Sequence, residues 1–189
     1  MNTFVKNQIL GIAENFKALA EMSADVVQVA ELCTQALRAG HKVMFCGNGG
    51  SAADSQHLAA ELVGRYKLNR PAMNALALTV DTSILTAVGN DYGYDVVFSR
   101  QVEGVGRAGD VLIGLSTSGN SRNIVKAMQL AKTMGITTVA LTGQGGGEMK
   151  EVADFCIAVP SGATNNIQEM HIAVGHLICE LVEKEIHGA

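Results

Sequence analysis

The chain has 189 residues, which suffices for one sizeable hydrophobic core and is too short for two independent ones. Its formal net charge is −4 and it has no basic cluster, which argues against broad nucleic-acid binding, because such binding needs Lys and Arg at phosphates. Hydrophobic residues make up 48% of the chain, but no apolar run is as long as a membrane span and no secretion signal opens the chain, so we expect a soluble, cytoplasmic protein without a membrane partner.

Two helices are predicted at the start of the chain. The second runs from about residue 25 to 37 and stops before Gly40, a position where glycine commonly ends a helix. The first carries an apolar stripe at steps of three and four residues, formed by Val5, Ile9, Ile12, Phe16, Leu19 and Met22. Such a stripe needs a surface on which to pack.

Five short apolar runs follow, and helical stretches separate several of them. They are KVMFCG (42–47), NALALTV (74–80), DVLIGLS (110–116), TTVALTG (137–143) and FCIAVP (155–160). This alternation predicts an α/β fold with parallel strands and helices on both faces of the sheet. A last helix is expected from about 166 to 186. We expect one domain over 1–189, with N-terminal helices at about 1–39 and an α/β core at about 40–189.

Four cysteines stand singly in apolar surroundings, and none belongs to a CxxC pair. We expect them to be small buried side chains of a protein in a reducing compartment, and they are Cys33, Cys46, Cys156 and Cys179.

Two loops rich in glycine and serine, GNGGSA (47–52) and STSGNS (116–121), each follow an apolar strand and precede a helix. Free N–H groups at a helix start, together with hydroxyls, can surround a phosphate without any lysine. One such loop could equally be ordinary helix capping, but two in one chain favour a sugar phosphate or a nucleotide. A dinucleotide is disfavoured because Ala52 replaces the third glycine of the usual motif and no acidic residue ends the next strand region, NALALTV, before Asp81. The Walker motif is absent as well.

His57 and Glu61 are four residues apart in the helix expected after the first loop. Their side chains therefore lie about 40° apart around the helix axis, on one face. They could share a proton, a metal ion or a substrate. Arg65 follows Glu61 by another four residues, which favours an ordinary ion pair between the two.

Four segments of the chain are distinctive when taken together: CGNGGSAADSQHLAAEL, ALTVDTSILTAVGNDYGYDVVFSRQV, GDVLIGLSTSGNS and IQEMHIAVGHLICELVE. Together they closely resemble the phosphoheptose isomerases, or sedoheptulose 7-phosphate isomerases, of the sugar-isomerase (SIS) superfamily. The resemblance runs from about residue 5 to 183. The serine loops are specific only to the superfamily, whereas their combination with His57, Glu61, Gln168 and His176 is specific to the isomerase.

The resemblance implies a five-stranded, flavodoxin-like sandwich that assembles as a homotetramer with active sites at subunit interfaces. It implies one zinc ion per subunit, with ligands His57, Glu61, Gln168 and His176. Spacing alone would not select His176, since His171 lies closer to Gln168 around a helix. The implied contacts to the phosphorylated seven-carbon sugar come from Asn48, Gly49, Gly50, Ser51, Glu61, Asn90, Asp91, Ser116, Thr117, Ser118, Ser121 and Gln168.

The implied reaction is an aldose–ketose isomerisation, from D-sedoheptulose 7-phosphate to D-glycero-D-manno-heptose 7-phosphate through an enediol. It needs a base beside the carbon acid, an acid for the carbonyl oxygen and stabilisation of the enediolate. By analogy with the family, Glu61 is the base at C2 and His176 exchanges protons on the other side. The sequence leaves open whether Glu61 acts mainly as base or as zinc ligand. The product would begin the route to ADP-heptose for lipopolysaccharide, or to GDP-heptose for other surface glycans.

Two other classes compete with the enzyme. Non-enzymatic SIS proteins that bind the replication initiator resemble this chain, but they lack a carboxylate at the position of Glu61 and a histidine at that of His176. SIS regulators of transcription usually add a DNA-binding domain, and the N-terminal helices here are neither basic nor of helix-turn-helix pattern. The enzyme is therefore the favoured interpretation.

Overall fold

The computed structural model describes residues 1–188. Two helices, α1 (Asn2–Ala20) and α2 (Ser23–Arg38), precede a region in which strands and helices alternate. The strands are β1 (Val43–Gly47), β2 (Ala75–Ala77), β3 (Val111–Ser116), β4 (Thr137–Thr142) and β5 (Phe155–Ala158). The further helices are α3 (Gly50–Val63), α4 (Thr82–Tyr92), the short 3-10 helix η1 (Tyr94–Val96), α5 (Val97–Val105), α6 (Arg122–Thr133), α7 (Gly147–Val152) and α8 (Thr164–His187).

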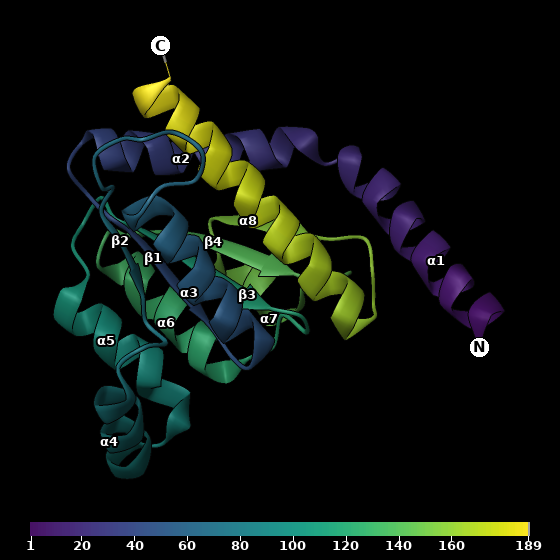
Figure 1. The fold of residues 1–189 in the computed structure, drawn as a ribbon. Coiled ribbons are helices and arrows are strands. Elements are labelled where there is room, and N and C mark those ends of the chain that lie inside the picture. The colour runs from purple at the N-terminus through teal and green to yellow at the C-terminus, as the bar shows by residue number, and fades with distance from the viewer. Residues whose placement is uncertain (189) are drawn as a thin grey trace.

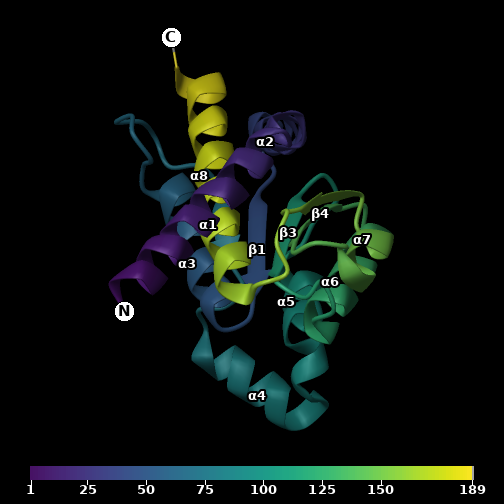
Figure 2. The ribbon, with the colours of Figure 1, turned by 90° about the vertical axis from the view of Figure 1, so that its right-hand side faces the viewer.

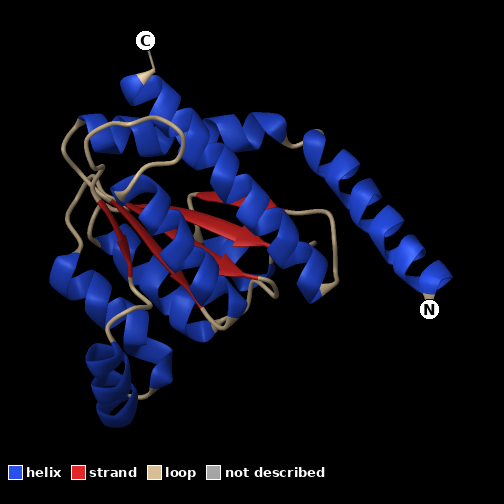
Figure 3. Cartoon of the chain, in the orientation of Figure 1, coloured by secondary structure: helices blue, strands red, loops and turns tan. Residues whose placement is uncertain are grey.

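The five strands form one parallel sheet in the order β2-β1-β3-β4-β5 (Figure 3). This confirms the predicted α/β class and all five predicted strands. The strand order is that of flavodoxin-like folds, in which the chain turns to opposite sides of the sheet after β1 and after β3. Ligands of such sheets bind in the crevice between these two carboxyl ends. Both serine loops therefore lie at the expected binding edge.

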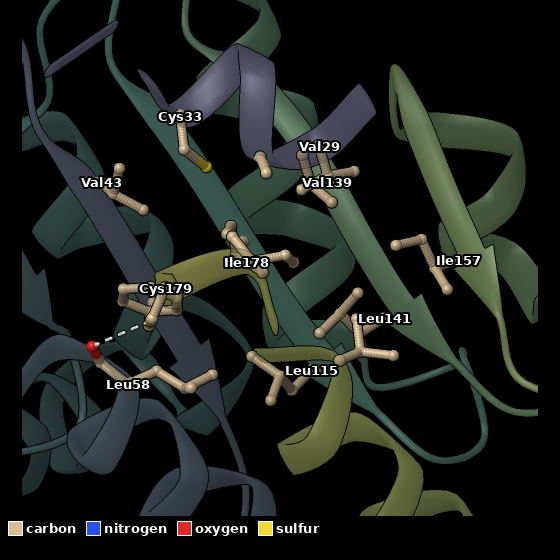
Figure 4. Packing of buried hydrophobic residues seen from close by; sticks show 14 of the residues in the cluster. Val29, Cys33, Val43, Leu58, Leu115, Val139, Leu141, Ile157, Ile178 and Cys179 are labelled. Atoms are coloured by element: carbon tan, nitrogen blue, oxygen red, sulfur yellow. Dashed lines mark hydrogen bonds between the residues drawn. The ribbon is translucent and has the colours of Figure 1, made fainter. Parts of the chain in front are cut away.

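Helices cover both faces of the sheet, as Figure 2 shows with α3 and α8 on one side and α6 and α7 on the other. Every residue of β1 and β3 is buried, because apolar side chains of parallel strands meet a helix layer on each face. On the first face, side chains of β3 and β4 such as Leu115 and Leu141 pack against α2 and α8 (Figure 4). On the second, Leu112 and Ala140 pack against α5 and α6.

Helices α3 and α8 lie side by side, and small residues allow their close approach (Figure 1). A Cβ atom added at Gly175 of α8 would lie 2.5 Å from both Leu58 methyl groups of α3. One turn further along α8, the Cys179 thiol lies 3.9 Å from the carbonyl oxygen of Leu58 (Figure 4). Near the start of both helices, the Gln168 amide faces the backbone of Gly50. The two helices therefore run in the same direction, and residues of one can meet residues of the other along their length.

Helix α1 extends away from the rest of the chain (Figure 1). Of its predicted apolar stripe, Leu19 is buried, whereas Val5 and Ile9 are 52% and 60% exposed. A groove of about 440 Å³ lies between the end of α1, the start of α2 and α8, and is lined by Phe16, Val26, Leu177 and other apolar side chains. None of the helices within residues 1–188 is both long enough and apolar enough to cross a membrane.

Candidate active site

The first serine loop forms a tight link between β1 and α3. Strand β1 ends at Gly47 and α3 begins at Gly50, so two residues reverse the chain. Gly49 has φ = +56°, a left-handed conformation that side chains other than hydrogen disfavour. A Cβ at Gly47 would collide with the backbone of Ser51. The glycines thus allow the first turn of α3, whose N–H groups have no partner within the helix, to lie directly at the end of β1.

The second loop gathers hydroxyl groups at the end of β3. The buried Ser116 Oγ lies 2.8 Å from Ser121 Oγ and 3.4 Å from Ser118 Oγ. Ser118 Oγ also accepts a hydrogen bond from the Asn120 amide at 3.1 Å. Thr117 is half-buried, and its carbonyl accepts from the Gly143 amide. The hydroxyls hold one another in place at the start of α6.

A pair of asparagine side chains joins the two loops. Asn48 Nδ2 donates to Asn123 Oδ1 at 3.0 Å, and Asn123 Nδ2 donates to Asn48 Oδ1 at 2.9 Å. Asn123 is buried at the start of α6, and its Oδ1 also accepts from the Ile124 amide. Sequence reasoning missed Asn123, which lies 75 positions from its partner. Its side chain fixes the first loop relative to the second.

Three side chains converge two turns along α3 from the first loop. His57 and Glu61 project from α3, with His57 Nε2 3.2 Å from Glu61 Oε1. His176 of α8 places its Nε2 2.9 Å from His57 Nε2. The parallel packing of α3 on α8 brings together residues that are 119 positions apart. Glu61 faces His57 rather than Arg65, and Arg65 has no ion pair within residues 1–188, so the expected Arg65–Glu61 pair was wrong.

The donor atoms of His57, Glu61 and His176 suit a metal ion. All three lie within 4.8 Å of one another, and a set of two imidazoles and one carboxylate is typical of catalytic zinc sites with an open position. Donors around a tetrahedral zinc ion lie about 3.3 Å apart, because each bond is about 2.0–2.1 Å long. The two distances from His57 Nε2, 2.9 Å and 3.2 Å, are close to that spacing.

The other predicted site residues lie at several places in the fold, and not all of them are near this group. Ser51 is buried in the first turn of α3. The Gln168 amide lies against Gly50, where an added Cβ would be 2.6 Å from its Nε2. Eight residues of α8, about 12 Å along its axis, separate Gln168 from His176. Asn90 and Asp91 are exposed at the end of α4 and hydrogen-bond to each other at 2.8 Å.

Asp54 is a further carboxylate near the histidines that sequence reasoning missed. Its Oδ2 is buried and has no hydrogen-bond partner in the described part of the chain. Burial raises the pKa of the Asp54 carboxyl, and charge on His57 and His176 opposes that rise. Asp54 lies three residues before His57 and seven before Glu61, on the same face of α3, so helical spacing could have identified it.

Known proteins share this fold and sequence. The SIS domain family matches residues 9–143. A phosphoheptose isomerase of Akkermansia muciniphila is 81% identical over 188 residues, which cover 100% of this chain and 100% of that protein. One from Sulfurimonas denitrificans is 54% identical over 191 residues, with 100% of this chain and 98% of that protein covered.

Solved structures agree with these sequence relatives. The phosphoheptose isomerase of Neisseria gonorrhoeae superposes with a TM-score of 0.87 at 44% identity, covering 96% of this chain and 99% of that one. The enzyme from Francisella tularensis superposes with a TM-score of 0.89 at 32% identity, covering 97% and 99%. This likeness extends over nearly the whole of each chain. The chain therefore belongs to the SIS-domain family and, within it, to the phosphoheptose isomerases.

Proposed function

We propose that this chain isomerises D-sedoheptulose 7-phosphate to D-glycero-D-manno-heptose 7-phosphate through an enediol. The observation that carries the proposal is the convergence of His57, Glu61 and His176 within 4.8 Å, in a chain 81% identical to a phosphoheptose isomerase. A carboxylate beside two imidazoles supplies the base and the acid that an aldose–ketose isomerisation requires.

The phosphate end of the sugar binds at the two serine loops. Support comes from the free amides at the start of α3 and from the hydroxyls at the end of β3, which adjoin across the switch point of the sheet. The proposed phosphate contacts are Asn48, Gly49, Gly50, Ser51, Ser116, Thr117, Ser118 and Ser121. Because the Asn48 side chain already pairs with Asn123, Asn48 contributes mainly by holding the loop.

Proton transfer belongs to Glu61 and His176. In the direction from ketose to aldose, a proton leaves C1 and another is delivered to C2. Glu61 exchanges the proton at C2, and His176 exchanges protons on the other side of the enediol. Gln168, Asn90 and Asp91 are assigned to the sugar hydroxyls. Gln168 is supported by its place beside Gly50, at the first serine loop.

Zinc is the metal we propose for the His57, Glu61 and His176 group. We also propose Gln168 as a fourth ligand, although in this chain its amide lies against Gly50, about 12 Å along α8 from His176. When bound, it would polarise the sugar oxygens and so stabilise the negative charge of the enediolate. The amide of Gln168 is the weakest donor of the set, since zinc sites favour Cys, His and carboxylates. Because one ligand is weak, we expect the bound metal ion to exchange readily with metal ions in solution.

We further propose a homotetramer with active sites at the subunit interfaces. The exposed apolar stripe of α1 supports it, because large exposed apolar surfaces commonly mark protein contacts. Helix α4, which carries Asn90 and Asp91 at its end, contributes no buried residue within this chain. The four cysteines are unpaired, which supports a location in the reducing cytoplasm. There the product would enter synthesis of a nucleotide-activated heptose.

The test is conversion of sedoheptulose 7-phosphate in deuterium oxide, with and without zinc after treatment with a chelator. Aldose formation with deuterium at C2 is the expected result, and its loss without metal would establish the metal requirement. A folded protein that forms no aldose and exchanges no deuterium under either condition would refute the enzyme proposal. Binding to the replication initiator would then be tested.

A further inference from the structure

We call the candidate ligands His57, Glu61 and His176 the metal-binding group. Further along α8 from this group, a buried ion pair joins α8 to the loop that follows α3. Arg70 Nε lies 3.0 Å from Glu183 Oε1, and each side chain is only 2% exposed. Within residues 1–188, neither side chain hydrogen-bonds to a side chain of the proposed substrate site. A buried pair of this kind is weak support for a purely stabilising role, because the cost of removing both charges from water offsets much of their attraction.

The Glu183 carboxylate holds three successive backbone amides in addition to Arg70. The amides of Tyr66, Lys67 and Leu68 donate to it at 2.9, 2.7 and 2.9 Å. Burial alone would raise the pKa of Glu183, but these amides and Arg70 lower it overall, so the carboxylate stays ionised. One side chain of α8 thereby fixes the path of the chain directly after α3.

Arg70 reaches back to the end of α3. Its Nη2 donates to the carbonyl oxygen of Glu61 at 2.8 Å, and its Nη1 donates to that of Leu62 at 2.8 Å. The last carbonyls of a helix have no partner within the helix, so the guanidinium group caps α3. Glu61, the proposed base, is thus held through its own backbone.

The same network reaches His176 through Tyr66. The half-buried Tyr66 ring lies 5.7 Å from the His176 ring, centroid to centroid, at an interplanar angle of 38°. Glu183 holds the backbone of Tyr66 and lies seven residues after His176, within about 20° of it around α8. The ion pair therefore contacts the backbone of Glu61 directly and reaches His176 through one intervening residue, Tyr66.

We propose that Arg70 and Glu183 are positioning residues that set the spacing between Glu61 of α3 and His176 of α8. The inference rests on the proposed function for its effect on turnover. Its effect on the geometry of the metal-binding group is independent of the substrate. Groups that orient ligands in this way commonly change metal affinity or activity by about 10- to 100-fold when they are removed.

The test uses the double variant Arg70→Met with Glu183→Leu, which replaces both charges by apolar side chains of similar size. Cobalt(II) serves as the probe, because its visible absorption spectrum reports the arrangement of its ligands without any turnover. We expect cobalt affinity to fall about tenfold or more with an altered spectrum, and kcat to fall about 10- to 100-fold with little change in KM.

A second variant tests whether the hydrogen bonds of the Arg70 guanidinium group are needed, or only its positive charge. Arg70→Lys keeps the positive charge, but its single ammonium group cannot bridge Glu183 and the two carbonyls of α3 at once. Positioning predicts that Arg70→Lys loses kcat and cobalt affinity as the double variant does. It keeps the interpretation testable if the double variant fails to fold.

The matched control is the pair of half-buried Lys42 and buried Asp110, 2.6 Å apart at the opposite, amino-terminal edge of the sheet. Lys42→Met with Asp110→Leu should alter stability and leave kcat and the cobalt spectrum unchanged. Folded Arg70 and Glu183 variants with the cobalt affinity and spectrum of the unaltered chain would overturn the inference. If the unaltered chain itself fails to isomerise the sugar, the proposed function fails, and the cobalt measurements still decide whether this pair positions the group.

Discussion

The side chain and the backbone of Glu61 have different partners. Its carboxylate faces His57, and its carbonyl oxygen accepts a hydrogen bond from Arg70. Changing the carboxylate to an amide keeps this backbone contact and removes both the negative charge and the basicity. We expect Glu61→Gln, and separately His176→Gln, to lower kcat for the heptose phosphate by about 10²- to 10⁴-fold, as is typical for loss of a positioned acid or base. Steady-state kinetics on the purified variants would measure this.

Glu14→Gln makes the same chemical change on the exposed surface of α1 and should leave kcat unaltered. Melting temperature and oligomeric mass should match those of the unaltered chain in all three variants. Turnover that persists in both Glu61→Gln and His176→Gln would remove these residues from the proposed mechanism.

Asn123 links the two proposed phosphate loops through its pair of hydrogen bonds to Asn48. Replacing it by Ala removes two hydrogen bonds to Asn48, each worth about 1 kcal/mol. The first loop would then be free to move relative to the second, so we expect KM for the sugar phosphate to rise about tenfold with a smaller change in kcat. Asn74→Ala, at an exposed position before β2, is the control. An unchanged KM in Asn123→Ala would show that the pair does not shape the phosphate site.

The site residues that the sequence could identify are those whose signal is local or belongs to the family. His57 and Glu61 share a helix face because they are four residues apart. Asn123 and Arg70 give no such signal, because their function comes from partners that only the folded chain brings near. The apposition of His176 with His57 likewise depends on two helices packing in parallel, which residue spacing within either helix does not encode.

At the scale of elements, the strands were predictable and one helical region was not. The runs that became β1 and β3 are mostly apolar, and that of β4 has the apolar centre VAL, since these strands are buried on both faces along almost their whole length. The run 74–80 yielded only the three-residue edge strand β2. Residues 82–105 form α4, η1 and α5. Helix α4 buries none of its residues, so its sequence has no apolar stripe facing the core from which the helix could be predicted. Its one clear signal is Asp81, whose side chain caps the helix through the Ile84 amide.

Helix α1 carries the exposed apolar stripe that we propose as a contact between subunits. Ile9 is 60% exposed in the middle of its apolar stripe. We expect Ile9→Asp to leave the α/β core folded and to shift the assembly to smaller species, because a buried carboxylate at an interface is costly. Sedimentation velocity over a range of concentrations would measure the change.

Asn7→Asp places the same side chain about 200° around α1 from Ile9 and should not alter the assembly. An Ile9→Asp protein with unaltered sedimentation would show that the stripe of α1 makes no contact between subunits.

For the whole molecule, lowering the pH reduces the free energy of unfolding through several buried or hydrogen-bonded groups in turn. His171 is fully buried, and burial lowers the pKa of its imidazole from 6.5 to about 4. Between these values the unfolded chain binds a proton that the folded chain does not, so stability falls as the pH drops from 6.5 to about 4. The pKa values of Glu183 and Asp154 are lowered as well, so their contributions are lost at still lower pH.

His171→Leu removes the first of these contributions without adding a charge. We expect the free energy of unfolding of the unaltered chain to fall by on the order of 3 kcal/mol more than that of His171→Leu between pH 7 and pH 4. Urea unfolding with a chelator present would measure both, so that loss of metal does not enter. If the free energy of unfolding changed equally with pH in the two proteins, the role given to His171 would be contradicted.

Cys179 lies between the two helices that carry the metal-binding group, with its thiol against the Leu58 carbonyl. Burial raises the pKa of this thiol, so a maleimide or disulfide reagent can reach a thiolate there only when α8 briefly parts from α3. The labelling rate at Cys179, measured by mass spectrometry, therefore reports how often α8 separates from α3. An ion held by His57 and Glu61 on α3 and by His176 on α8 would link the two helices and make their separation rarer. The labelling of Cys179 should therefore slow when zinc is added. A rate indifferent to zinc would mean that no ion bridges the two helices.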